Sequence, residues 1–231
     1  MKAVILAGGL GSRLKPFTQV IPKPLLPIGE KSVLEIQISL LKKYGFRDIF
    51  LCTNYKSEYI EKFFGDGRKY DIQLTISKEK QPLGTVGPLS LIKKDLNEPF
   101  LLINGDILTL LNFKKLYDFS LEKKSSLTIS IVKHILPFAF GDILFKGDFV
   151  TAIKEKPKIE RYIIAGVYLM MPEILSYIPD NKYYNMDELI IKMLEEKTPI
   201  AKYEINEYWL DIGRIEDYKK AQNDYKNIFE E

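Results

Sequence analysis

A glycine-rich segment close to the N-terminus carries the residue types that bind phosphate. An apolar run from Val4 to Ala7 leads directly into the sequence GGLGSR at residues 8 to 13. Glycines let main-chain N–H groups approach an anion closely, and Arg13, Lys15 and Lys23 supply positive charge nearby. This combination predicts a loop that holds phosphate. An ordinary connection between a strand and a loop is the alternative, because a glycine turn alone is weak evidence.

The spacing of these residues differs from that of two common phosphate loops. A dinucleotide fingerprint requires a third glycine where Leu14 stands, and a Walker loop requires Lys followed by Ser or Thr where Arg13 and Leu14 stand. Prolines at positions 16, 22, 24 and 27 disfavour a helix after the glycines. The segment is therefore predicted to be a long loop.

An aspartate follows the apolar run of residues 100 to 103. In open α/β sheets a side chain just beyond a parallel strand faces the ligand crevice, so Asp106 is placed to hold a divalent metal that bridges phosphates. The sequence Asn104-Gly105-Asp106 is also typical of a simple turn, which is the alternative. His134, the only histidine, lacks a catalytic partner in the pattern and is interpreted as structural.

The elements that must position these residues alternate between strands and helices. Ser32 and Glu35 form a capping box for a helix that ends at Gly45. A loop at residues 77 to 88 is expected to open into a helix whose first turn includes Pro88. Asn112 is predicted to cap a helix that runs to about residue 123. The other predicted helices cover residues 57–64, 172–177, 186–196 and 216–229, and the predicted strands cover residues 4–7, 48–53, 72–76, 100–104, 126–133, 142–145, 149–154, 163–170, 200–205 and 208–212.

Composition limits the classes of protein. The 231 residues suffice for one substantial core, and the net charge of +3, from 34 basic and 31 acidic residues, indicates neither nucleic acid nor an anionic membrane as a partner. No leader pattern and no run of about 18 apolar residues is present, so membrane spanning is not expected. Cys52 is the only cysteine, which excludes an internal disulfide and fits a cytoplasmic protein with Cys52 packed in a core.

Six motifs together resemble one enzyme family. GGLGSRLKPFT at residues 8 to 18, followed by PKPLLPI, resembles the signature of the sugar-1-phosphate nucleotidylyltransferases. PLGTVGPL at 82 to 89, NGD at 104 to 106, EKP at 155 to 157, IAGVYLM at 164 to 170 and WLDIG at 209 to 213 follow in the family's order. The likeness is greatest to the short guanylyltransferase branch. Ile164 departs from the asparagine that many relatives carry, which leaves the identity of the sugar open.

The resemblance implies a fold. It indicates a single α/β domain over residues 1–231, a Rossmann-like three-layer sandwich with a mainly parallel, mixed central sheet. Residues 1 to about 110 would bind the nucleotide, and residues from about 111 to 231 would bind the sugar phosphate. Some relatives carry a β-helix of hexapeptide repeats after the catalytic domain, and none is expected here because the sequence has no internal repeat.

The resemblance also implies an activity and its residues. The substrates would be a nucleoside triphosphate and a sugar 1-phosphate, with Arg13 and Lys23 as catalytic cations and Mg²⁺ held by Asp106 and Asp211. The nucleotide-binding residues would be Leu6, Ala7, Gly8, Gly9, Gly11, Ser12, Arg13, Glu79, Pro82, Gly84 and Thr85. The sugar-phosphate-binding residues would be Asn104, Gly105, Gly141, Glu155, Lys156, Ala165 and Gly166. A homo-oligomer is compatible with the sequence, which does not determine the oligomeric state.

Glu79 favours GTP as the nucleotide. Guanine presents two adjacent donors, which a carboxylate accepts without donating, whereas an amide suits uracil or thymine. Thymidylyl relatives carry glutamine in this region. The alternatives are that Glu79 is one solvated charge beside Lys78 and Lys80, that the enzyme uses UTP or dTTP, or that the chain is a catalytically silent paralogue that binds nucleotide sugars. A nucleotide-binding oxidoreductase is excluded by the glycine spacing.

Overall fold

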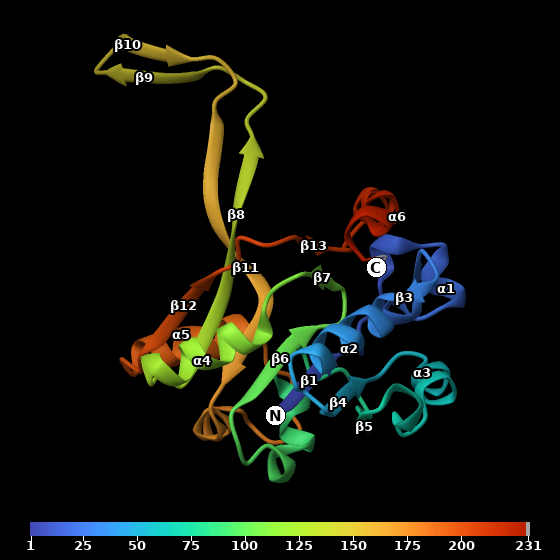
Figure 1. Ribbon diagram of the computed structural model, residues 1–231. Coiled ribbons are helices and arrows are strands. Elements are labelled where there is room, and N and C mark those ends of the chain that lie inside the picture. The colour runs from blue at the N-terminus through green and yellow to red at the C-terminus, as the bar shows by residue number, and fades with distance from the viewer. Residues whose placement is uncertain (230–231) are drawn as a thin grey trace.

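Strand β1 (Lys2–Leu6) lies inside a seven-stranded sheet whose strands follow the order β12-β8-β11-β6-β1-β4-β5. The protein is described by a computed structural model that covers residues 1–229 (Figure 1), and residues 230 and 231 of the predicted domain lie outside the described residues. The other strands of this sheet are β4 (Asp48–Thr53), β5 (Gln73–Lys78), β6 (Phe100–Asn104), β8 (Leu127–Pro137), β11 (Lys158–Met170) and β12 (Ile200–Glu204).

The sheet is mixed and mainly parallel. Strand β1 pairs in parallel with β4 and β6, and β4 pairs in parallel with β5. Strand β12 also runs parallel to β8, whereas β11 is antiparallel to both of its neighbours. This arrangement confirms the predicted fold class, and residues 1–229 contain no β-helix.

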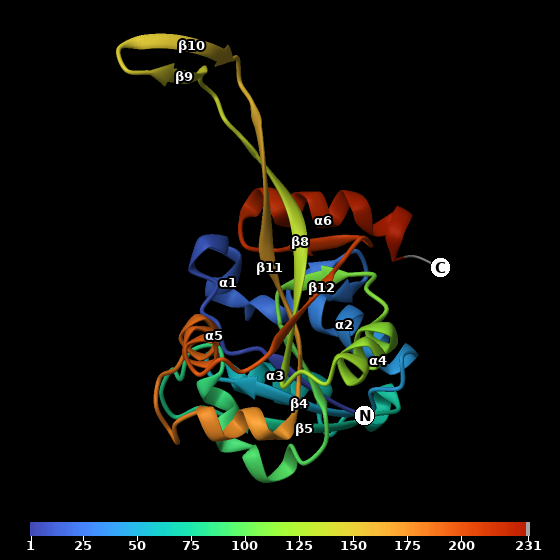
Figure 2. The same ribbon diagram turned by 90° about the vertical axis from the view of Figure 1, so that its left-hand side faces the viewer.

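Helices cover both faces of the sheet because β1 is apolar on both sides. Ala3 and Ile5 pack in one buried cluster with α2 (Val33–Lys43), α3 (Ser57–Phe64) and α4 (Phe113–Lys123). Val4 packs in a second cluster with α5 (Met186–Glu195), η4 (Gly87–Leu91) and η6 (Pro172–Tyr177). The predicted three layers are therefore present, as Figure 2 shows from the side. No helix within residues 1–229 is both long and apolar enough to cross a bilayer.

The loop after β1 is less extended than predicted. Three short helices interrupt it: η1 (Ser12–Leu14), α1 (Phe17–Val20) and η2 (Lys23–Leu25). The prolines did not prevent these turns, because they lie at or beside the helix ends, where a missing N–H costs little. The chain then crosses β2 (Pro27–Ile28) and β3 (Lys31–Ser32) to reach α2, whose capping box of Ser32 and Glu35 is present. The remaining short helices are η3 (Arg68–Tyr70) and η5 (Lys93–Asp95).

Strands β8 and β11 are longer than the sequence predicted. Strand β8 continues four residues beyond Lys133, and β11 begins at Lys158 instead of Ile163. Their outer halves pair with each other and project from the body as a two-stranded arm (Figures 1 and 2). The strands predicted at residues 142–145 and 149–154 form a hairpin, β9 (Asp142–Lys146) and β10 (Phe149–Lys154), at the end of this arm.

A small third core joins the end of the chain to the glycine loop. Strand β13 (Trp209–Asp211) pairs antiparallel with β7 (Ile107–Thr109), and α6 (Ile215–Ile228) follows it. Leu14 of the loop packs there in one buried cluster with Leu210 and Tyr225. This core holds the two chain ends that carry predicted site residues against each other.

Gln37 of α2 fixes the turn that carries Asp106. Its Nε2 donates to the main-chain carbonyls of Asn104, at 2.9 Å, and Ile107, at 2.8 Å. The side chain is 4% exposed, so water does not replace these bonds. Gln37 therefore couples α2 to the connection between β6 and β7.

We expect Gln37→Leu to destabilise the protein, because two buried carbonyls lose their donor at a cost of about 1–3 kcal/mol. Urea unfolding followed by circular dichroism measures this change. Ser39→Ala, on the exposed side of the same helix, is the matched control and should leave the free energy of unfolding unchanged within about 0.5 kcal/mol. Equal stability of the two variants would show that Gln37 does not hold the turn.

Candidate active site

Four neighbouring parallel strands each place a side chain or a glycine at one edge of the sheet. Gly8, Asn54, Glu79 and Asp106 follow β1, β4, β5 and β6 within two residues. The carboxyl ends of these strands open into two adjoining pockets of 380 Å³ and 220 Å³. Both pockets are lined by Leu6, Gly9 and Asp106, so they form one continuous cleft.

The smaller pocket is shaped by the glycine loop. Gly11 has φ of 60°, a left-handed conformation that side chains disfavour, and Thr18 Oγ1 donates to its carbonyl at 2.8 Å. A Cβ at Gly11 would lie 2.7 Å from Thr18 Cγ2, so the position has no room for a larger residue. Arg13 and Lys23 line the same pocket and make it positively charged.

Two aspartates meet beside this pocket although they are far apart in the sequence. The pairing of β13 with β7 places Asp211 opposite Ile107, and Ile212 N–H donates to the Asp106 carbonyl at 2.9 Å. Lys23 Nζ forms an ion pair with Asp106, and both side chains are largely shielded, with 11% and 25% exposed. The strand pairing therefore gathers the two carboxylates and one of the cations.

The Asp211 side chain is partly buried and lies near the Asp106 carboxylate. Burial, and after it the Asp106 carboxylate, raise the pKa of Asp211 to about 6, although Lys23 and Arg13 oppose the shift. Its Oδ1 is buried and has no hydrogen-bond partner among the described residues. A buried, unpaired carboxylate oxygen is costly, which is typical of a ligand-binding position.

These carboxylates fit a magnesium ion that also binds phosphate. Mg²⁺ prefers oxygen ligands and usually retains water and substrate phosphates beside one or two carboxylates. Asp106 and Asp211 supply such a pair, with one oxygen unpaired. Residues 1–229 hold no group of three or more acidic, histidine or cysteine side chains suited to a metal, so the donors beyond this pair would come from phosphate and water.

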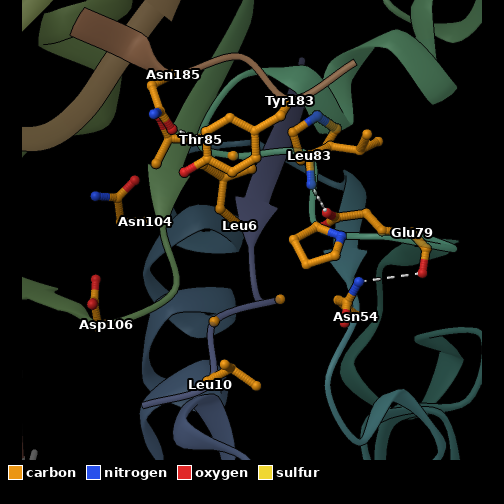
Figure 3. Close-up of a pocket in the computed structure, with 15 residues that line it drawn as sticks. Leu6, Leu10, Asn54, Glu79, Leu83, Thr85, Asn104, Asp106, Tyr183 and Asn185 are labelled. Atoms are coloured by element: carbon orange, nitrogen blue, oxygen red, sulfur yellow. Dashed lines mark hydrogen bonds between the residues drawn. The ribbon is translucent and has the colours of Figure 1, made fainter. Parts of the chain in front are cut away.

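The larger pocket contains Glu79 at the side opposite Asp106, as Figure 3 shows. Glu79 Oε2 accepts from the Leu83 N–H at 2.9 Å, and Oε1 lies where a Cβ on Gly8 would be 2.8 Å away. Burial raises the pKa of Glu79, and the Leu83 hydrogen bond partly offsets this rise. Glu79 is therefore a positioned carboxylate at the pocket wall.

The rim of this pocket is built from two segments about 100 residues apart. Thr85 Oγ1 accepts from Met186 N–H at 2.8 Å, and Asn185 Oδ1 accepts from Thr85 N–H at 3.3 Å. Gly84 has φ of 80°, and a Cβ there would lie 2.6 Å from the Tyr184 carbonyl. The loop after β5 is thus tied to the start of α5, which forms the wall at the top of Figure 3.

The structure brings most of the predicted site residues together. The two pockets are lined by Leu6, Ala7, Gly8, Gly9, Gly11, Ser12, Arg13, Lys23, Glu79, Pro82, Gly84, Thr85, Asn104, Gly105 and Asp106. Ala165 and Gly166 lie next to them: the Ala165 carbonyl accepts from Trp209 Nε1 at 2.8 Å, and a Cβ on Gly166 would meet Asn104 Nδ2 at 2.7 Å.

Three predicted residues lie elsewhere. Gly141, Glu155 and Lys156 are exposed at the base of the β9–β10 hairpin, and none of them lines either pocket. His134 is exposed on the arm, and Cys52 is buried in the core as expected.

Several pocket residues were not predicted from the sequence. Asn54 follows β4 in the same way that Asp106 follows β6, so the same rule of strand ends would have found it. Tyr183 and Asn185 precede α5 and reach the pocket only through tertiary folding. No local pattern signals them.

Known proteins share this architecture. The nucleotidyl transferase family model matches residues 2–228. The mannose-1-phosphate guanyltransferase of Saccharomyces cerevisiae is 33% identical over 98% of this chain and 65% of its own length. The mannose-1-phosphate guanylyltransferase catalytic subunit beta of Danio rerio is 32% identical over 94% of this chain and 62% of its own length, so the chain spans slightly less than two thirds of these curated relatives. The crystal structure of HddC from Yersinia pseudotuberculosis complexed with GMP-PN superimposes with a TM-score of 0.76 at 31% identity, covering 97% of this chain and 99% of that chain.

We expect Asp211→Asn to raise stability in metal-free buffer at neutral pH. The raised pKa means that the folded state binds the Asp211 proton more tightly than the unfolded state, so ionisation costs stability as the pH rises from about 4 through 6. With solvent screening allowed for, the gain is about 1 kcal/mol, or about 2–4 °C in Tm.

Thermal unfolding in EDTA at pH 4 and pH 7.5 measures this difference. The gap in Tm between variant and wild type should widen as the pH rises, and Asp148→Asn, exposed at the hairpin turn, should show no such gap. A variant that is less stable than wild type at pH 7.5 would contradict the assignment.

Proposed function

This chain belongs to the nucleotidyl transferase family, and from that premise we propose that it transfers a nucleotidyl group from a nucleoside triphosphate to a sugar 1-phosphate. The products are a nucleotide sugar and pyrophosphate. The observation that carries the proposal is the grouping of Lys23, Asp106 and Asp211 beside a glycine-lined pocket. A base-sized pocket adjoins this group on the other side.

The chemistry requires positioning and charge neutralisation. A sugar-phosphate oxygen attacks the α-phosphorus in line as the bond to pyrophosphate breaks, so no protein nucleophile is needed. The glycine loop offers main-chain N–H groups to the phosphates, and Arg13 and Lys23 offset their charge. A preorganised donor of this kind contributes about 3 kcal/mol to the transition state.

Asp106 and Asp211 are the residues that would hold Mg²⁺. A bound Mg²⁺ supplies a positive charge that neutralises phosphate oxygens. The unpaired Oδ1 of Asp211 and the shielded Asp106 carboxylate are the donors available for it. Lys23 contacts Asp106 directly and also lines the smaller pocket, so its positive charge lies where it can offset the charge of the phosphates.

GTP is the nucleotide that Glu79 suits best. The Leu83 N–H holds Oε2, and the carboxylate can accept from the adjacent N1–H and amino group of guanine. The structure of HddC from Yersinia pseudotuberculosis contains GMP-PN, and the related enzymes of Saccharomyces cerevisiae and Danio rerio are named mannose-1-phosphate guanyl- or guanylyltransferases. We therefore favour a hexose or heptose 1-phosphate as the acceptor, with mannose 1-phosphate as the first compound to test.

Pyrophosphate release from each of GTP, UTP, dTTP, ATP and CTP, crossed with a panel of sugar 1-phosphates and Mg²⁺, tests this function. GTP with a hexose or heptose 1-phosphate should give the highest kcat/KM. Equal or better use of UTP or dTTP would favour a uridylyl- or thymidylyltransferase. Release from no combination would favour a silent nucleotide-sugar-binding paralogue.

We expect Glu79→Gln to reduce the preference for GTP over UTP by roughly tenfold or more in kcat/KM, because an unpaired donor on buried guanine costs about 1–3 kcal/mol. Lys80→Gln changes the exposed neighbour on the same loop and serves as the control, which should keep the wild-type ratio. An unchanged nucleotide ratio in Glu79→Gln would remove Glu79 from base recognition.

We expect Lys23→Ala to lower kcat by roughly 100-fold while changing the KM for the nucleotide little, because a charge aimed at the transition state acts mainly on the chemical step. Lys15→Ala, an exposed lysine of the same loop, is the control and should retain most of the turnover. Steady-state kinetics in saturating Mg²⁺ separate the two parameters. A normal kcat with a raised KM would assign Lys23 to ground-state binding alone.

A further inference from the structure

The arm formed by β8 and β11 holds a hairpin away from the body of the protein. Seven residue pairs, from Ile164 with Ile131 to Lys158 with Pro137, form a continuous antiparallel ladder beyond a bulge in β11. At about 3.3 Å per residue this ladder is about 23 Å long. Figures 1 and 2 show from two directions that the β9–β10 hairpin at its end stands apart from the body of the chain.

One face of the hairpin is entirely apolar and uncovered. Residues paired across the two strands share a face, so Ile143 with Ile153 and Phe145 with Val150 form a patch of four large side chains. Their exposed fractions range from 49% to 74%. Half of the exposed large hydrophobic side chains in residues 1–229 lie between positions 135 and 164. An isolated two-stranded hairpin is marginally stable, so this face requires a partner.

The base of the hairpin carries the residues that the motif resemblance assigns to the sugar phosphate. A Cβ on Gly141 would lie 3.4 Å from Glu155 Oε2, so these residues are neighbours, with Lys156 next in the chain. The ladder keeps all three away from the two pockets of their own chain. Arg13 and Lys23 are the only cations that line those pockets within the described residues, and Lys23 is paired with Asp106. Further cations of the same chain, among them Lys133 and Arg214, line an adjacent third cavity and not these two pockets.

A third cavity lies beneath the arm and leads to the candidate active site. It measures 840 Å³ and is lined by Val132, Leu136 and Ile163 of the arm, and by Trp209, Asp211 and Arg13 of the body. Most of the remaining lining is polar or charged and includes Lys133, Arg214 and Lys220. The apolar members offer contacts to an apolar hairpin face, and Asp211 and Arg13 border the proposed catalytic group. The cavity is thus an open surface next to the place where the sugar phosphate would bind.

We propose that two copies of this chain exchange arms, so that the hairpin of each lies in the cavity beneath the arm of the other. Glu155 and Lys156 of one copy then complete the sugar-phosphate site of its partner, an inference that rests on the proposed function. A second copy is the occupant that we favour, because the motif resemblance assigns these residues to the sugar phosphate and a twofold exchange covers both apolar faces at once. A different protein or a lipid surface would cover the patch without using Glu155 and Lys156.

Molar mass by light scattering tests the association. The wild type should have the mass of a dimer, and Phe145→Asp should have that of a monomer with an unchanged circular dichroism spectrum, because Phe145 is 74% exposed on the hairpin and does not belong to the buried cores. Lys146→Asp places the same side chain on the mixed face of the hairpin and should remain dimeric. A monomeric wild type, or a dimeric Phe145→Asp, would overturn the proposal.

Complementation tests whether the sites are shared. Asp211→Asn and the double variant Glu155→Ala/Lys156→Ala are co-expressed with different tags, and the doubly tagged dimer is assayed at a sugar-phosphate concentration well below KM. With exchange, the body of the double variant retains Asp211 and receives Glu155 and Lys156 from the arm of the Asp211→Asn chain, so each such dimer has one intact site. Its activity should be about half that of wild type, although each parent is nearly inactive.

Each outcome of this assay has one meaning. Activity near the mean of the two parents shows that Glu155 and Lys156 act within their own chain and overturns the exchange. Failure to recover a doubly tagged dimer has the same consequence. A wild-type protein that releases no pyrophosphate in the substrate panel instead refutes the proposed function, and the light-scattering result then decides on arm exchange alone.

Discussion

Two carboxylates held side by side in partial shelter from water are the constraint around which this structure is arranged. Asp106 and Asp211 repel each other, and burial adds to the cost of ionising Asp211. Lys23 and Arg13 offset part of that cost, while the β7–β13 pairing and the Gln37 hydrogen bonds keep the carboxylates from separating. The third core contributes to the same arrangement. Leu14 of the glycine loop packs with Leu210 of β13 in this core, which keeps the cations of the loop close to the carboxylates.

The sequence was informative wherever local geometry sets the outcome. A residue just beyond a parallel strand must lie at the carboxyl edge, so Asp106 and the glycines after β1 could be placed in the crevice before the fold was known. Helix starts at Ser32 and Asn112 were equally accessible, because capping depends on a few neighbouring residues. Gln37, Tyr183 and Asn185 were not, since their partners lie far along the chain and a glutamine or tyrosine in a helix or loop has no distinctive pattern.

The arm shows a different limit of sequence reasoning. The two strands of the hairpin were predicted on either side of Lys146-Gly147-Asp148, and both are present. The predicted lengths of the two strands beneath it were too small, because charged residues such as Lys133 and Arg161 resemble the end of a strand. In the structure they are exposed members of a ladder, and Lys133 forms an ion pair with Glu160 at 2.7 Å. A period of two residues shows which side chains share a face, but it does not show what that face packs against.

The residues that we propose for base recognition, phosphate chemistry and sugar recognition lie on separate elements of this fold. Glu79 belongs to a loop tied to α5, whereas Asp106 and Asp211 belong to paired strands on the other side of the cleft (Figure 3). Glu155 and Lys156 lie on an arm that shares neither support. Changes in the loop or in the arm can therefore alter which nucleotide or sugar is accepted without disturbing the carboxylates and cations at the reaction centre. Under the proposed function, such a division would let one arrangement of charges serve different nucleotide and sugar combinations, since only the catalytic group has to satisfy the electrostatic constraint.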